Sequence, residues 1–230
     1  MKAPSQSPYP AAGFTLIELL ASMGVIAILA SILIVGIGKA RLAAAENVSR
    51  SNLRQLGSMI LLYTTEADGR LPYGAHSDPE GKTQIGWDQQ IINAGIADEA
   101  DLQAVAFAPN IIHDNQATIP RSYSMVRTRH AGVGMTVYGD DTTEQLPVSR
   151  IPDPAKVLML TEKFVSPHSF GGYAHAVIDT PDEQVRFAPE RTEFNYLFVD
   201  GHVETLEPNA TIGEGSLKSP KGIWTIDPTD

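Results

Sequence analysis

The sequence predicts an α+β fold in which a long N-terminal helix packs on a C-terminal antiparallel β-sheet. Two observations predict it: residues 14–38 form an almost unbroken apolar run, and the second half of the chain alternates β-forming residues with turn signals. As a helix, the apolar run would rise about 37 Å, which exceeds the roughly 30 Å of a bilayer's hydrocarbon core. We therefore expect the first half of the helix to span a membrane.

The helical pattern continues beyond the apolar run, but on one side only. Between residues 39 and 66, apolar residues recur mostly at spacings of three or four, which is typical of an amphipathic helix. These positions are Leu42, Ala45, Val48, Leu53, Leu56, Met59, Ile60 and Tyr63. Asp68 and Gly69 supply a stop signal. We predict one helix from about Phe14 to Glu66, whose second half lies against a sheet.

Residues 67–230 are assigned to a globular α+β head. Residues 70–120 are rich in loop signals, with short helices expected at 87–94 and near 98–101. Strands are expected at 121–127, 133–138, 157–160, 174–178, 194–199 and 202–206. The last two flank Asp200-Gly201, and Asp-Gly readily adopts the positive φ angles of a tight turn, so they predict a hairpin.

Composition excludes several classes of protein. The chain has 230 residues, a formal net charge of −10 and a pI near 5.0, and this acidity argues against a nucleic-acid partner. It contains no cysteine, which excludes disulfides, thiolate metal sites and cysteine nucleophiles. A head without disulfides depends on its hydrophobic core for stability.

Glu18 is the only charged residue in the apolar run, at residues 14–38. A carboxylate near the bilayer centre costs roughly 2.5 to 3.5 kcal/mol, so it needs a cationic partner. The nearest basic side chains, Lys2 and Lys39, are both remote in sequence. Cleavage between Gly13 and Phe14 would create a charged α-amino group four residues before Glu18. Proteolysis would thus supply the missing cation.

The residues Gly13 to Leu20, GFTLIELL, with the apolar run after them, resemble the processing site of type IV pilins and type II secretion pseudopilins. The resemblance implies that residues 1–13 are a leader, which prepilin peptidase removes by cutting after Gly13. It also implies that Phe14 becomes the methylated N-terminus. By the same resemblance, Glu18 serves assembly by pairing with the N-terminal amine of a neighbouring subunit.

The C-terminal segment extends this resemblance. FNYLFVDGHVETL, which contains the expected hairpin, resembles the "DG" element of a large group of bacterial pilin-like proteins. The chain departs from that group at Glu190, where many members have histidine, and at residues 107–109, where a common cysteine is absent. No role attached to that histidine is carried over to this chain.

The charges flanking the apolar run conflict with the orientation that the resemblance implies. That orientation places the leader in the cytoplasm and the head in the periplasm or extracytoplasmic space of a bacterial inner-membrane protein. Only Lys2 and the amino terminus are basic on the leader side, whereas four bases follow the run. They are Lys39, Arg41, Arg50 and Arg54. Counting positive charges alone favours the opposite orientation.

The sequence contains no recognisable catalytic motif, so we predict that the protein is not an enzyme. The six histidines lack zinc-site spacing, and no GxSxG sequence occurs. His168, His175 and Asp179 could be drawn as a site, but solvent-facing loop residues are the favoured interpretation. Calcium is the one cofactor left open, because two acid-bearing loops lack EF-hand spacing but offer oxygen ligands. Their acids are Asp140, Asp141, Glu144, Asp179, Asp182 and Glu183.

Two functions of different class remain. In the first, the protein is a structural subunit of a type IV pilus or a type II secretion pseudopilus. Its partners are then other pilin-like subunits, prepilin peptidase, the assembly platform and the lipid bilayer. In the alternative, the helix tethers an extracytoplasmic domain that binds a glycan or another surface ligand.

Overall fold

The computed structural model describes residues 15–77, 84–109, 121–127, 145–165, 170–171 and 175–227. It confirms the predicted α+β fold, because a long N-terminal helix, α1 (Leu16–Glu66), packs on a mostly antiparallel C-terminal sheet. The chain divides into two compact units, residues 1–44 and residues 45–230, and α1 contributes to both. The division of the chain into four segments remains a prediction; the segments are 1–13, 14–38, 39–66 and 67–230.

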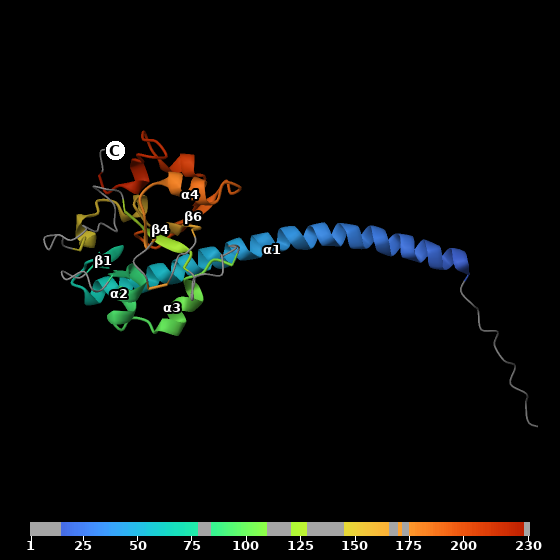
Figure 1. The fold of residues 1–230 in the computed structure, drawn as a ribbon, viewed down its shortest axis with the longest axis horizontal. Coiled ribbons are helices and arrows are strands. Elements are labelled where there is room, and N and C mark those ends of the chain that lie inside the picture. Colours follow the sequence, from blue (N-terminus) through green and yellow to red (C-terminus); the bar gives the residue numbers. More distant parts are fainter. Residues whose placement is uncertain are drawn as a thin grey trace, which may run out of the picture. The chain divides into compact units, whose positions relative to one another are not determined.

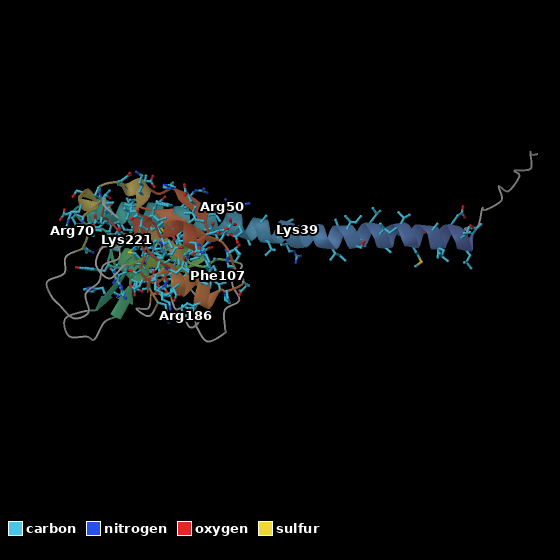
Figure 2. All side chains as sticks on the ribbon, turned by 90° about the horizontal axis from the view of Figure 1, so that it is seen from above. Lys39, Arg50, Arg70, Phe107, Arg186 and Lys221 are labelled. Atoms are coloured by element: carbon cyan, nitrogen blue, oxygen red, sulfur yellow. The ribbon has the colours of Figure 1, made fainter. Side chains whose placement is uncertain are left out.

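The first unit contains the apolar part of α1. Its large apolar side chains are exposed on all sides of the helix, from Leu16 at 81% to Ile37 at 44% (Figure 2). Such exposure is costly in water and favourable in lipid. This part of the helix therefore matches the composition expected of a segment surrounded by hydrocarbon. Phe14, the predicted first residue of the helix, lies outside the described residues.

The second unit is built on a five-stranded sheet with the order β5-β3-β4-β6-β7. The strands are β3 (Tyr123–Val126), β4 (Leu158–Glu162), β5 (Val177–Ile178), β6 (Phe194–Phe198) and β7 (Val203–Leu206). β3 pairs antiparallel with β4, β4 with β6, and β6 with β7, whereas β5 runs parallel to β3. All five strands overlap segments that the sequence predicted as strands.

The predicted hairpin is confirmed as β6 and β7. Gly201 in its turn has a φ of 93°, a conformation that glycine adopts without steric cost. The strand expected at 133–138 lies outside the described residues. The described neighbours of β3 are instead β4 and β5, which follow it at a long distance in the sequence.

Shorter elements complete the second unit. The expected short helices are present as α2 (Trp87–Asn93) and α3 (Glu99–Val105), and the Asp98 carboxylate caps α3 by accepting a hydrogen bond from the Asp101 amide at 2.8 Å. The unit also contains the β1 (Ala75–Ser77) and β2 (Gln84–Gly86) pair and the helix α4 (Pro181–Phe187). These three elements were not predicted, because they are too short for periodicity to identify. The 3-10 helices are η1 (Val148–Arg150), η2 (Pro154–Lys156), η3 (Pro208–Thr211) and η4 (Gly222–Trp224).

The core of the second unit lies between α1 and the sheet. Leu53, Leu56 and Ile60 are fully buried, as their spacing predicted. The prediction is wrong at Val48, which is 47% exposed. At that end of the helix, the polar side chains of Ser49 and Asn52 are buried against the head instead.

Gly57 sets how closely α1 approaches β6. A Cβ atom at Gly57 would lie 3.0 Å from Cδ2 of Leu197, closer than side chains normally pack. The helix therefore rests on the strand at a position where only hydrogen is accommodated without rearrangement. The close approach of backbone to side chain, rather than a turn, explains this glycine.

We expect Gly57→Leu to destabilise the second unit by about 1–3 kcal/mol, since the added atoms overfill the contact with Leu197. The measurement is chemical denaturation of the full chain in detergent. Ser58→Leu is the matched control, because Ser58 is exposed and leucine is the better helix former. Equal stability of the two variants would contradict the packing argument.

Candidate assembly site and the buried polar cluster

The N-terminal turn of α1 is held by Thr15 and Glu18. The Glu18 oxygen Oε2 accepts hydrogen bonds from the Thr15 amide at 2.9 Å and from the Thr15 hydroxyl at 2.8 Å. In return, the Glu18 amide donates to Thr15 Oγ1 at 3.3 Å. This reciprocal arrangement is a capping box, which satisfies amides that the helix itself leaves unpaired.

The capping box gives Glu18 hydrogen-bond donors but no positive charge. Both donors belong to Thr15, which is neutral, and no cation forms an ion pair with Glu18 within the described ranges. The Thr-x-x-Glu spacing in the sequence predicts such a box, and the sequence analysis missed it. Gly13 and Phe14 lie outside the described residues, so their proposed roles in cleavage and methylation stay predictions.

The helix that follows is long and apolar enough to cross a membrane. Its most apolar window of 18 residues has a mean hydropathy of 2.6 and is wholly exposed. Length and composition alone support this statement. They fit a protein that crosses a membrane once.

In the second unit, α1 meets the sheet through a group of polar side chains that we call the polar cluster. Its members are Glu46 and Ser49 of α1, Tyr123 of β3, Glu162 of β4, and Arg191 and Asn195. Asn52 extends the polar contact by donating from Nδ2 to the carbonyl of Phe107 at 2.8 Å; Phe107 is labelled in Figure 2. The helix is therefore attached to the head by hydrogen bonds as well as by its apolar stripe.

Glu162 lies at the centre of the polar cluster and is 1% exposed. Its oxygen Oε1 accepts from the Ser49 hydroxyl at 2.5 Å and from Asn195 Nδ2 at 3.1 Å. Its Oε2 accepts from the Asn195 amide at 2.9 Å and from Arg191 Nη2 at 3.4 Å. Four donors thus surround one carboxylate, which compensates part of the cost of removing it from water.

Arg191 connects the two carboxylates of the polar cluster. Its Nη2 also donates to Glu46 Oε1 at 2.9 Å. Its guanidinium carbon lies 4.9 Å from the ring centre of Phe164 and 5.5 Å from that of Phe194, so the cation is placed over two aromatic faces. The Arg191 side chain therefore links α1 to β4. It also stacks on Phe164, which follows β4, and on Phe194, the first residue of β6.

Burial raises the pKa of Glu162, and Arg191, Ser49 and Asn195 partly oppose that change. Burial also raises the pKa of Tyr123, whose hydroxyl lies 3.0 Å from Ser49 Oγ. Glu162 and Ser49 are both shielded from solvent, and their side chains form hydrogen bonds with one another and with their neighbours in the polar cluster. The arrangement suits a structural link between helix and sheet.

The polar cluster predicts a pH dependence of stability. Because the folded pKa of Glu162 is raised above the unfolded value of about 4.3, its contribution is complete below about pH 4 and is lost as the pH rises through the folded pKa. Glu162→Gln keeps the shape and removes the titration. We expect the stability of this variant relative to the parent to increase as the pH rises from about 4 through the folded pKa of Glu162. Urea denaturation of both chains at several pH values measures it; a constant difference would contradict the prediction.

Two of the three described acids considered for calcium, Asp179 and Glu183, face protein cations. Asp179 forms a two-pronged pair with Arg127, at 2.8 Å for each oxygen. Glu183 pairs with Lys163 Nζ at 2.6 Å and accepts from the Asp179 amide at 2.9 Å. Asp182 lies with Glu183 in the first turn of α4. In the described part of the chain, no group of three or more His, Cys, Asp or Glu residues could hold a metal ion.

The remaining acids considered for calcium, Asp140, Asp141 and Glu144, lie outside the described residues, as does His168. Burial lowers the pKa of His175, which makes an edge contact with Phe187 at 6.5 Å between ring centres. Asp179, the third residue of the trio drawn with His168 and His175, is paired with Arg127 as described above. Calcium binding stays an untested hypothesis.

Sequence reasoning missed the residues of the polar cluster. Glu162 and Asn195 stand in the strands LMLTE and FNYLF, both of which are buried at every position. A charged or amide side chain inside such a run is a signal, because buried polar groups require partners. Which partners they have is decided only by the fold.

Comparison with known families gives one match. Residues 10–34 match the prokaryotic N-terminal methylation motif. Neither a curated protein nor a solved structure matches the chain significantly. The match, together with α1, supports a precursor similar to type IV pilins and pseudopilins, which assemble with other pilin-type subunits after processing by prepilin peptidase.

Proposed function

We propose that the protein is a structural subunit of a type IV pilus or a type II secretion pseudopilus. The observation that carries this proposal is the methylation motif at residues 10–34, placed at the start of a helix that runs from Leu16 to Glu66. Prepilin peptidase cuts after Gly13, and Phe14 becomes the methylated N-terminus. The head lies in the periplasm or extracytoplasmic space, and the subunit passes from the inner membrane into the filament.

In this proposal, the charge of Glu18 drives the exchange of lipid for neighbouring subunits. The Thr15 donors satisfy hydrogen bonds of the carboxylate but leave its charge uncompensated. A charge without a counter-ion is expensive in hydrocarbon, whereas the N-terminal amine of a neighbouring subunit would neutralise it. The exposed apolar side chains of α1 then pack against other helices in place of lipid.

The direct test of this proposal is mass analysis of the mature N-terminus. We expect the protein isolated from its native membrane to begin at Phe14 and to carry a methyl group on its amine. The membrane-bound precursor in a strain without prepilin peptidase serves as the control and should begin at Met1. A native chain that retains residues 1–13 would refute the proposal.

Variants of Glu18 separate its charge from its role in the capping box. Glu18→Ala removes both, whereas Glu18→Gln retains a residue that is accepted in capping boxes and removes the charge. We expect both variants to be processed and to stay in the membrane, and both to fail to enter filaments. Filament yield is measured by shearing and immunoblotting. Normal yield from Glu18→Gln would show that capping, and not charge, is what matters.

A further inference from the structure

One narrow face of α1 in the second unit is left uncovered by the head, and we call it the outer face. Its residues are Asn47, Val48, Ser51, Arg54, Gln55, Ser58 and Leu62. They are all exposed, and their spacings of three, four and seven place them along one side of the helix. The opposite side carries Leu53, Leu56 and Ile60, which are fully buried.

The outer face combines exposed apolar side chains with the cation of Arg54. In the described part of the second unit, three large apolar side chains are exposed: Leu62 at 50%, Val48 at 47% and Val185 at 37%. Two of the three belong to the outer face. Within the same described part, the guanidinium of Arg54 makes no hydrogen bond or ion pair.

Arg50 flanks the outer face and donates to Asn47 Oδ1 at 2.7 Å; it is labelled in Figure 2. The exposed acid on the same side of α1 is Glu66, which follows Leu62 by one turn and stands twelve residues beyond Arg54, so Arg54 has no acid beside it on the outer face. Its other members are small or neutral polar residues, which allow a partner to approach closely. The face therefore presents a positive centre with an apolar residue toward each end.

The rest of the head has the opposite charge. Residues 67–230 contain 24 acids and 12 bases, a net charge of −12. The most uniformly acidic described segment is 84–109, which has four acids and no base. One of the four, Asp88, is buried and paired with Arg121 at 2.7 Å. The other three, Asp98, Glu99 and Asp101, are exposed at the start of α3, and we call them the acidic turn.

We propose that the outer face of α1 is a docking surface for a second copy of this chain, whose acidic turn lies against Arg54. The proposal rests on the proposed function, in which copies pack side by side. Heads of net charge −12 repel one another, and screening confines attraction to contacts within roughly 10 Å at ordinary ionic strength. A filament of such heads therefore needs local positive surface at its contacts, and the outer face supplies it.

Charge also favours a second copy over a membrane surface as the occupant. Anionic lipid would attract Arg54 but repel the strongly acidic head, which packs on the other side of the helix. Only Val48 and Leu62 on the outer face are apolar, which is fewer than an interfacial helix normally offers to lipid. A protein surface that places several acids opposite Arg54 complements the outer face better than a lipid surface does.

Charge reversal in the full chain tests the pairing. We expect Arg54→Glu to lower filament yield about tenfold, since it places like charges at the contact. Combining it with Glu99→Lys and Asp101→Lys should restore the yield, and these changes leave Asp98 as the cap of α3. Asn209→Glu, at an exposed position elsewhere on the head, is the matched control for added negative charge and should leave the yield unchanged. Unchanged yield from Arg54→Glu, or an equal loss that the compensating changes do not relieve, would overturn the proposal.

Because the chain has no cysteine, introduced cysteines can be crosslinked without background. Chains with Arg54→Cys and chains with Asp101→Cys, expressed together, should form disulfide-linked dimers in membranes and filaments. Arg54→Cys expressed with Lys218→Cys is the control, since Lys218 is exposed elsewhere on the head. Crosslinking of the control pair alone, or of neither pair, would overturn the proposal.

The crosslink also separates this inference from the proposed function. If the chain forms no filament but the Arg54→Cys and Asp101→Cys pair crosslinks in membranes, docking stands and filament formation fails. If filaments form without that crosslink, docking fails and the proposed function stands. Protection of the cysteine at position 54 from a water-soluble thiol reagent, without any crosslink, would identify lipid as the occupant and overturn the proposal.

Discussion

The structure depends on how it compensates carboxylates that lie in surroundings that disfavour charge. Glu162 is buried in the head, where Arg191 and three hydrogen bonds from Ser49 and Asn195 compensate it. Glu18 lies at the start of the apolar run, where, among the described residues, Thr15 donates the hydrogen bonds that it accepts. The first acid is satisfied within its own chain. The second has no cation beside it among the described residues, and in the proposed function a neighbouring subunit supplies one.

The same helix meets two environments along its length. Its first part is apolar on every side, which only lipid or other apolar helices accommodate. Its second part buries Leu53, Leu56 and Ile60 against the sheet and adds polar contacts from Ser49 and Asn52. The polar contacts fix how the helix is rotated on the sheet more specifically than apolar packing alone, since each buried donor requires its own acceptor.

The distribution of charge connects the head to assembly. Its acids outnumber its bases by 24 to 12, so copies of the head repel one another at long range and attract only where opposite charges meet. The described acids on α4 and before it, Asp179 and Glu183, are already paired with Arg127 and Lys163. The acids at the start of α3 are exposed instead, which leaves them available to another molecule.

The sequence by itself determined the apolar half of α1, the processing motif and the β6–β7 hairpin. Each depends on residues that are close in the chain: an apolar run, GFTLIELL, and Asp200-Gly201 between two strands. Only the tertiary structure decided that Val48 is exposed while Ser49 faces the sheet, and that Glu162 meets Arg191. Helical periodicity identifies apolar positions, whereas a buried polar side chain is stabilised by partners distant in sequence, and folding alone brings those together.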